Sequence, residues 1–178
     1  SLYGGAIYVG FDSLFMKHVT MRNNRLHSSS SNVRGGALYV SDGVVSIDSC
    51  EFESNSVTSN STSPDRSGGS IAIYNSSATI TISNSSFRTD TAGIGGSIYM
   101  SGTPTVSVSG CTFRSDVANE RGGAIGVEGG TLVVTNSSLD SNWCQRTGGA
   151  IYVYSGTLRM TGDTLRHNST NTEGLGDN

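Results

Sequence analysis

Apolar and polar residues alternate at period two along most of the chain, in short runs that recur in six copies. The first run of each copy follows a glycine pair, as in "GGAIYV" at residues 4–9 and again at 148–153. Such alternation is typical of a strand with one buried face, and no stretch keeps the i, i+3, i+4 spacing of an amphipathic helix. The sequence therefore predicts an all-β protein.

The six copies define a repeat of about 26 residues. Glycine pairs begin at residues 4, 35, 68, 95, 122 and 148, and a short signature of the type "FRSD" follows at 21, 52, 87, 113, 139 and 165. Each copy holds three short strands: one after the glycines, one before the signature and one in it. Neighbouring copies stacked about 4.8 Å apart would bury the apolar face that one copy alone cannot.

This repeat predicts a single parallel β-helix over residues 1–178 with about six coils. We expect it to be right-handed, by the general rule for parallel crossovers. The chain begins inside a repeat, so we expect it to be a segment of a longer protein. Two insertions, at 25–34 and 56–67, are predicted as polar loops that leave the rod and are the best candidates for contacts.

Two columns of residues predict the corners of each coil. Three residues before the signature stand Asn84, Gly110, Asn136 and Gly162 in four of the six copies, and these types most easily take a positive φ. A second column closes the signature, where an Asn turned inward can bond backbone groups and the equivalent side chain above it. This corner ladder consists of Asn24, Asn55, Asp90, Asp116, Asn142 and Asn168. Asp90 and Asp116 would lie in adjacent coils, where they share a proton or accept extra N–H bonds.

The pairing of "GGAI" with "FxxN" resembles the repeat signature of the polymorphic outer-membrane proteins of chlamydiae (Pmp type). Here "GGAI" is strict at 4, 122 and 148, whereas "FESN" at 52 is the only strict FxxN. The resemblance covers the whole chain. It implies a β-helical passenger displayed at the cell surface and acting in adhesion.

Charge and hydropathy narrow the choice of partners. Charged residues make up 14% of the chain and the net charge is −3, which gives no electrostatic reason to expect nucleic acid. No apolar run of about 18 residues is present, so we expect no membrane span in this segment.

Two outer faces could bind partners. The outward position of the first strand carries Tyr8, Tyr39, Tyr99 and Tyr152, which would stack against sugars or a protein, or merely cover the strand. The outward positions of the second strand are rich in Thr and Ser. They resemble the lattice of β-helical ice-binding proteins, but Arg159 and Lys17 interrupt it, and strand propensity explains the hydroxyls.

An enzyme of the polysaccharide-cleaving class would need carboxylates grouped on one exposed strand. The outward slots of the first strand hold no acid, and His18, His27 and His167 are scattered. We therefore expect no catalytic residue, no metal site and no cofactor.

Cysteines and sequons complete the candidate chemistry. Cys50 and Cys111 fall two coils apart, beyond disulfide reach, whereas Cys144 is predicted in a loop where it could bond a missing part of the chain or another subunit. Sequons occur at Asn60, Asn75, Asn84, Asn136 and Asn168. The first four are possible glycosylation sites, while Asn168 belongs to the inward ladder and should stay bare.

The sequence favours a non-enzymatic, extracellular or cell-surface module that is structural and adhesive, with other proteins or glycans as partners. One alternative is a building block of a filament in which copies stack end to end, since an open strand stack is a template for further pairing. A polysaccharide-binding or polysaccharide-cleaving protein is the third.

Overall fold

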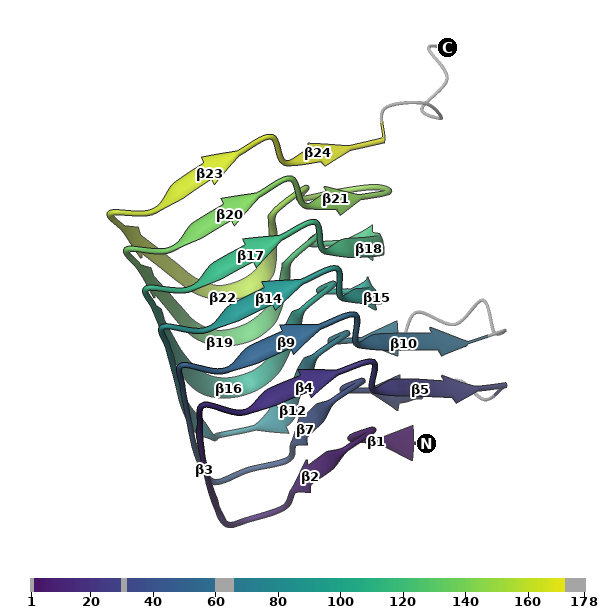
Figure 1. The fold of residues 1–178 in the computed structure, drawn as a ribbon, viewed down its shortest axis with the longest axis vertical. Coiled ribbons are helices and arrows are strands. Elements are labelled where there is room, and N and C mark those ends of the chain that lie inside the picture. The colour runs from purple at the N-terminus through teal and green to yellow at the C-terminus, as the bar shows by residue number, and fades with distance from the viewer. Residues whose placement is uncertain (1, 30–31, 60–65, 172–178) are drawn as a thin grey trace.

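The chain winds as a parallel β-helix of stacked coils (Figure 1). The computed structural model describes residues 2–29, 32–59 and 66–171. Every strand pair in this part is parallel and joins equivalent positions of successive repeats, as Ile71 pairs with Leu38 on one side and Ile98 on the other. The predicted fold class is thus confirmed.

Three sheets run along the helix, and each coil passes through them in the order sheet 1, sheet 2, sheet 3. Sheet 1 contains β2 (Ile7–Val9), β3 (Ser13–Lys17), β7 (Leu38–Val40), β8 (Val44–Asp48), β12 (Ile71–Ser76), β13 (Thr79–Ser83), β16 (Ile98–Ser109), β19 (Ile125–Thr135) and β22 (Ile151–Thr161). Sheet 2 contains β4 (Thr20–Arg22), β9 (Glu51–Glu53), β14 (Ser86–Arg88), β17 (Thr112–Arg114), β20 (Ser138–Asp140) and β23 (Thr164–Arg166). Sheet 3 contains β1 (Leu2–Tyr3), β5 (Arg25–Ser28), β6 (Val33–Arg34), β10 (Ser56–Ser59), β11 (Arg66–Ser67), β15 (Thr91–Ile94), β18 (Val117–Arg121), β21 (Trp143–Cys144) and β24 (Ser169–Thr170).

The predicted division into strands needs two corrections. The first and second predicted strands belong to one sheet, and in the last three coils they join into β16, β19 and β22. A glycine with positive φ, such as Gly102 (φ 89°), makes a bulge there without ending the strand. The third face of the coil is sheet 3, whose strands follow the corner ladder and are mostly too short to show an alternating pattern.

The insertions at 25–34 and 56–67 are not simply loops. Each begins and ends as a strand of sheet 3, and β5 pairs with β10 over four residues. Leu26 and Val57 are buried in a second apolar cluster with Val33 and Ala92, which explains why the insertions are ordered near the rod. The two strands extend beyond the rest of sheet 3 in Figure 1. We call β5 and β10 the projecting strand pair.

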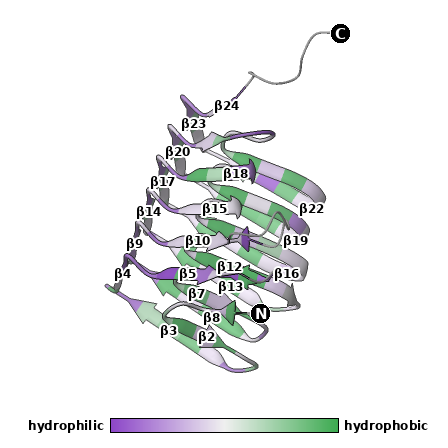
Figure 2. Ribbon diagram, turned by 90° about the vertical axis from the view of Figure 1, so that its right-hand side faces the viewer, coloured by the Kyte–Doolittle hydropathy of each residue, from purple (hydrophilic) through white to green (hydrophobic). Residues whose placement is uncertain are grey.

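The core consists of side-chain columns that repeat from coil to coil. Phe52, Phe87 and Phe113 are fully buried and stack with ring centroids 4.7 Å apart and planes within 6°. The apolar positions of sheet 1 form further columns, and the hydropathy colouring shows them as green segments along its strands (Figure 2). Neighbouring coils therefore bury each other's apolar faces, as the repeat predicts.

Positive φ angles occur at the same positions in every coil. The bend before sheet 2 is made by His18, Ser49, Asn84, Gly110, Asn136 and Gly162, which have φ between 49° and 71°. This confirms the predicted bend and includes the two copies that lack Asn or Gly. The two positions of the glycine pair require glycine for different reasons. Gly68 takes φ 66°, whereas a Cβ on Gly69 would overlap the carbonyl oxygen of Gly96 in the next coil.

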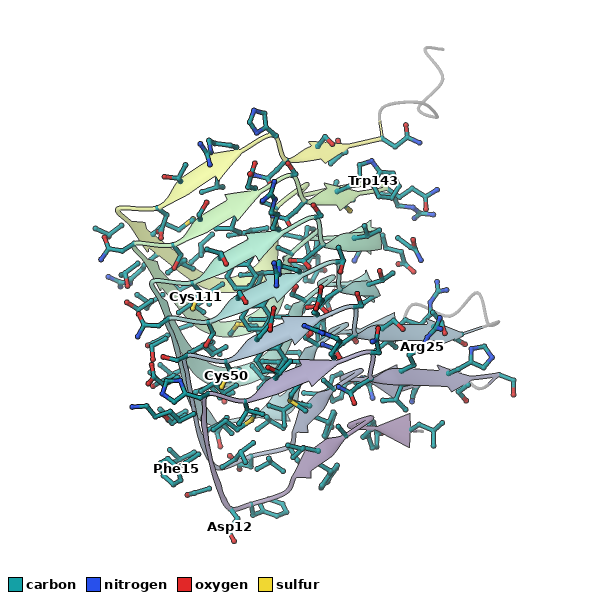
Figure 3. All side chains as sticks on the ribbon, viewed as in Figure 1. Asp12, Phe15, Arg25, Cys50, Cys111 and Trp143 are labelled. Atoms are coloured by element: carbon teal, nitrogen blue, oxygen red, sulfur yellow. The ribbon has the colours of Figure 1, made fainter. Side chains whose placement is uncertain are left out.

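The phenylalanine column predicts an asymmetric response to truncation. Phe87→Ala removes the middle ring of the stack and should lower the free energy of unfolding by about 3–5 kcal/mol. Phe15→Ala is the matched control, because the Phe15 side chain is 74% exposed on the outside of sheet 1 (Figure 3) and should cost less than about 0.5 kcal/mol. Chemical denaturation measures both values, and equal losses would contradict the assigned coil register.

Candidate functional site

The corner ladder continues the hydrogen bonding between coils where the sheets are interrupted. The backbone N–H of each corner residue donates to Oδ1 of the next corner side chain, at 2.8–3.0 Å in all five steps from Asn24 to Asn168. The residue before each corner has positive φ, such as Ser54 (φ 55°), so the chain turns there. The predicted inward orientation of the ladder is confirmed, and its four central members are fully buried.

The second polar atom of each ladder side chain distinguishes Asn from Asp. Nδ2 of Asn55, Asn142 and Asn168 donates to the backbone carbonyl of the signature residue in the preceding coil, at 2.9–3.2 Å. The equivalent carbonyls for Asp90 and Asp116 belong to Phe52 and Phe87. An ionised carboxylate has no proton to donate to such a carbonyl.

The Asp90 carboxyl group accepts hydrogen bonds from two hydroxyl groups. Its Oδ2 accepts hydrogen bonds from Ser70 at 2.6 Å and from Ser97 at 3.2 Å. Burial raises the pKa of Asp90 to about 7, although these hydroxyls and the backbone N–H of Asn55 act in the opposite direction. Ser70 and Ser97 are the third residues of "GGS", whereas the other four copies read "GGA". The change from "GGA" to "GGS" is thus a signal in the sequence for the two serines that bond a buried acid, and it was not among the predicted features.

Asp116 lacks such a donor at its second oxygen. Its Oδ2 is buried and has no hydrogen-bond partner within the described part of the chain, and the following repeat places Ala124 where a serine would stand. Burial raises the pKa of Asp116 well above its ordinary value, and the charge of Asp90 raises it further. Both effects favour the protonated form of Asp116, in which the carboxyl group carries a proton where the Asn side chain has its amide hydrogens.

The tyrosines predicted as a contact surface are only partly available. Tyr8 is 57% exposed and Tyr152 is half-buried, whereas Tyr39 and Tyr99 are 6% and 4% exposed. The expectation of a surface contact is wrong for Tyr39 and Tyr99. Tyr39 stacks against Tyr3 at 4.5 Å and Tyr8 at 5.4 Å between ring centroids, and burial raises its pKa to about 12.

Neighbouring side chains of sheets 1 and 3 explain the covered tyrosines. The guanidinium of Arg34 lies 3.5 Å from the centroid of the Tyr74 ring. The Tyr99 hydroxyl donates to Glu128 at 2.8 Å, and burial raises the pKa of Tyr99. The gap in the column at Gly126 is filled by Ile94, whose Cγ2 would lie 2.7 Å from an added Cβ. The column is a packed seam between sheets 1 and 3.

Two sequons are accessible. Asn84 and Asn136 are exposed at the bend before sheet 2, and Asn84 donates to Asp48 at 3.1 Å. Asn168 is half-buried and donates to the Leu139 carbonyl. Asn60 lies outside the described residues, and Asn75 lies in β12 with its side chain outside the description.

The cysteines are free and buried. Cys50 and Cys111 occupy one column two coils apart, inside the helix, and receive no disulfide (Figure 3). Burial raises the pKa of the Cys111 thiol. Cys144 lies in β21 and not in a loop, and its thiol donates to the Glu120 carbonyl at 3.0 Å. The expectation that it could bond another chain is therefore wrong for the folded coil.

The described residues offer neither a cluster of metal ligands nor a membrane-spanning helix. Residues 2–29, 32–59 and 66–171 contain no group of three or more His, Cys, Asp or Glu side chains that could hold a metal ion. Within the same ranges there is no helix long and apolar enough to cross a membrane.

Comparison with known proteins defines the class. The family model described as a right handed beta helix region matches residues 4–175. The chain belongs to this family, and the predicted handedness is confirmed. The comparisons with curated proteins and with solved structures gave no match.

The buried acids predict that stability falls as pH rises. The folded state keeps protons on Asp90 and Asp116 that the unfolded chain releases near pH 4, so their contribution is full below that value and is lost as pH rises toward 7 and above. Asp48 and Asp140 have lowered pKa values, so they act in the opposite sense, but only near and below pH 4. The melting temperature should be several degrees higher at pH 5 than at pH 8.

Asp116→Asn tests whether the buried carboxyl group causes this pH dependence of stability. The new amide can donate to the Phe87 carbonyl at any pH, so the variant should gain about 1–3 kcal/mol at pH 8 and lose much of the pH dependence. Asn142→Asp is the converse control and should be less stable at pH 8 than at pH 5. A wild-type melting temperature that rises between pH 5 and 8 would contradict the assignment.

Proposed function

We propose that the chain is a non-enzymatic structural and adhesion module at the cell surface, a rigid β-helical stalk or passenger of the Pmp type. Its interior is fixed by repeated columns, and surface variation is confined to the outer faces and insertions. Its partners would be extracellular proteins or glycans.

The single observation that carries the proposal is the projecting strand pair. β5 and β10 extend beyond the uniform coil and are held together by four register pairs. Leu26 and Val57 anchor the pair to the rod, while Arg25 and His27 lie on its exposed side. A bond of 3.1 Å between His27 and Thr58 ties the outer side chains together. This element presents polar side chains on a rigid support, as an adhesion surface requires.

An extracellular location is part of the proposal. Asn84 and Asn136 are exposed at a bend, and glycan there would not disturb the core. In material from a eukaryotic secretory route, glycopeptide mass spectrometry should find glycan at these two residues and none at Asn168.

A shortened variant tests adhesion. Deleting 27–32 and 58–65 leaves four residues between the corner and the glycine pair in each insertion, the same number as in residues 91–94 of the third coil. Beads coated with this variant should lose most of their attachment to cultured epithelial cells and matrix proteins, while circular dichroism and the melting temperature remain close to the wild type.

Arg159→Ser is the matched control, because Arg159 is exposed on sheet 1 away from the strand pair. Its beads should attach like the wild type. Equal attachment of the shortened variant, or no attachment of the wild type, would contradict the proposal.

A filament is the second candidate. Ile151, Leu158, Met160 and Leu165 of the last described coil line an open cavity of about 520 Å³. These are interior positions of the repeat, so an equivalent coil of a second copy could cover them. Electron microscopy of the concentrated chain tests this, and isolated short rods at every concentration would contradict it.

A further inference from the structure

One part of the corner ladder brings three groups of complementary reactivity into contact. Asn55 closes the second coil, whereas Ser70 and Asp90 belong to the third, and all three side chains are fully buried. The Ser70 hydroxyl donates to Oδ2 of Asp90 at 2.6 Å, and Nδ2 of Asn55 donates to the Ser70 hydroxyl oxygen at 2.9 Å. A carboxamide, a hydroxyl and a carboxylate are therefore linked by direct hydrogen bonds in a place that solvent does not reach.

Asp90 is placed to take the proton of the Ser70 hydroxyl. A serine hydroxyl attacks a carbonyl carbon only when a neighbouring base accepts its proton, and the distance of 2.6 Å is that of a strong bond between a hydroxyl and a carboxylate. Burial raises the pKa of Asp90 to about 7. Its carboxyl group can therefore both accept a proton and return it near neutral pH.

Two N–H groups polarise the side-chain carbonyl of Asn55. Its Oδ1 accepts a hydrogen bond from the backbone N–H of Asn24 at 3.0 Å and another from Nδ2 of Asn24 at 2.9 Å. Donors fixed in this way stabilise the negative charge that develops on the oxygen during acyl transfer. The amide nitrogen of Asn55 also lies 3.3 Å from Oδ1 of Asp90, which can supply a proton when the nitrogen leaves.

We propose that Ser70 and Asn55 react within the folded chain to form an ester bond, with Asp90 as the general base. The Ser70 Oγ moves from the amide nitrogen to the adjacent Cγ of Asn55 and forms the C–O bond, while Asp90 takes the hydroxyl proton. The C–N bond of the amide then breaks, and the nitrogen leaves as ammonia with the proton that Asp90 returns. The burial of the three side chains keeps out the water that would hydrolyse the ester.

The ester keeps the hydrogen bond that the corner requires. Its carbonyl oxygen is still Oδ1 of residue 55 and still accepts from Asn24, while only the amide's bond to the Met21 carbonyl is lost. The new bond closes residues 55–70 into a covalent loop that contains the insertion 56–67, and such a cross-link restricts the unfolded chain. This reaction is independent of the adhesion proposal, so either can fail alone.

The described part of the chain offers this combination once. Ala37 and Ala150 stand in the place of Ser70 next to the ladder residues Asn24 and Asn142. The amides of these two asparagines therefore have no serine hydroxyl at the equivalent position and should stay intact.

Mass spectrometry of the chain expressed in bacteria tests the bond. The intact protein should be lighter than its sequence mass by one molecule of ammonia. Trypsin separates residues 35–66, which contain Asn55, from residues 67–88, which contain Ser70. After denaturation and digestion these two peptides should appear as one species, with the mass of their sum less one ammonia, and hydroxylamine should split it.

Ser70→Ala and Asp90→Asn should both show the full sequence mass and two separate peptides. Both should fold, because four copies of the repeat have Ala at the first position and four have Asn at the second, and circular dichroism checks this. Ser97→Ala is the matched control, since Ser97 bonds Asp90 at 3.2 Å but has no hydrogen bond to Asn55 among the described residues. This variant should remain linked.

Three results would overturn the proposal. The first is a wild-type protein that gives separate peptides even after prolonged incubation. The second is loss of ammonia within residues 35–66 alone, which indicates a cyclic imide and no link. The third is a linked species in Ser70→Ala. Full linkage in Asp90→Asn would overturn the role of the carboxylate as the base.

Discussion

One backbone N–H per coil determines much of this structure. At each corner the carbonyl of the ladder residue accepts a bond from the next coil's backbone, as Asn55 does from Thr91, but its own N–H finds no backbone acceptor. Instead, this N–H donates to the Oδ1 of the short corner side chain in the next coil. Only Asn and Asp combine a carbonyl-type oxygen with this reach, so every copy of the repeat has one of them at this place.

The same constraint explains the chemistry of the interior. Asn and Asp both accept the corner N–H bond through Oδ1, but the second polar atom is an amide nitrogen in Asn and a carboxyl oxygen in Asp. The residues around an Asp must therefore differ from those around an Asn. Two copies of the repeat have Ser in place of Ala next to Asp90, whereas the Oδ2 of Asp116, beside Ala124, has no such hydroxyl donor and burial raises the pKa of that residue. The outer faces carry no such constraint. Projecting strands can therefore be added without disturbing the stack.

The sequence predicts the stacking of the coils well, because the residues that form the side-chain columns occur at equivalent positions in every copy of the repeat. The glycine pair, the aromatic signature and the ladder each repeat, so their alignment gives the coil register of Phe52, Phe87 and Phe113 directly. Sheet 3 could not be predicted from the sequence, because its strands have two to five residues and show little alternation of apolar and polar positions. The cover over Tyr39 and Tyr99 was also missed, since it comes from side chains such as Tyr3 and Glu128 that repeat periodicity does not place.

The central claim is that ladder side chains hold the corner amides, and native-state hydrogen exchange tests it most directly. The backbone N–H groups of Asn55, Asp90 and Asp116 donate to buried side-chain oxygens. They should exchange as slowly as the central strand amides of sheet 1, through opening reactions that approach the global free energy of unfolding. Rapid exchange of these three amides, while the flanking strands stay protected, would contradict the account.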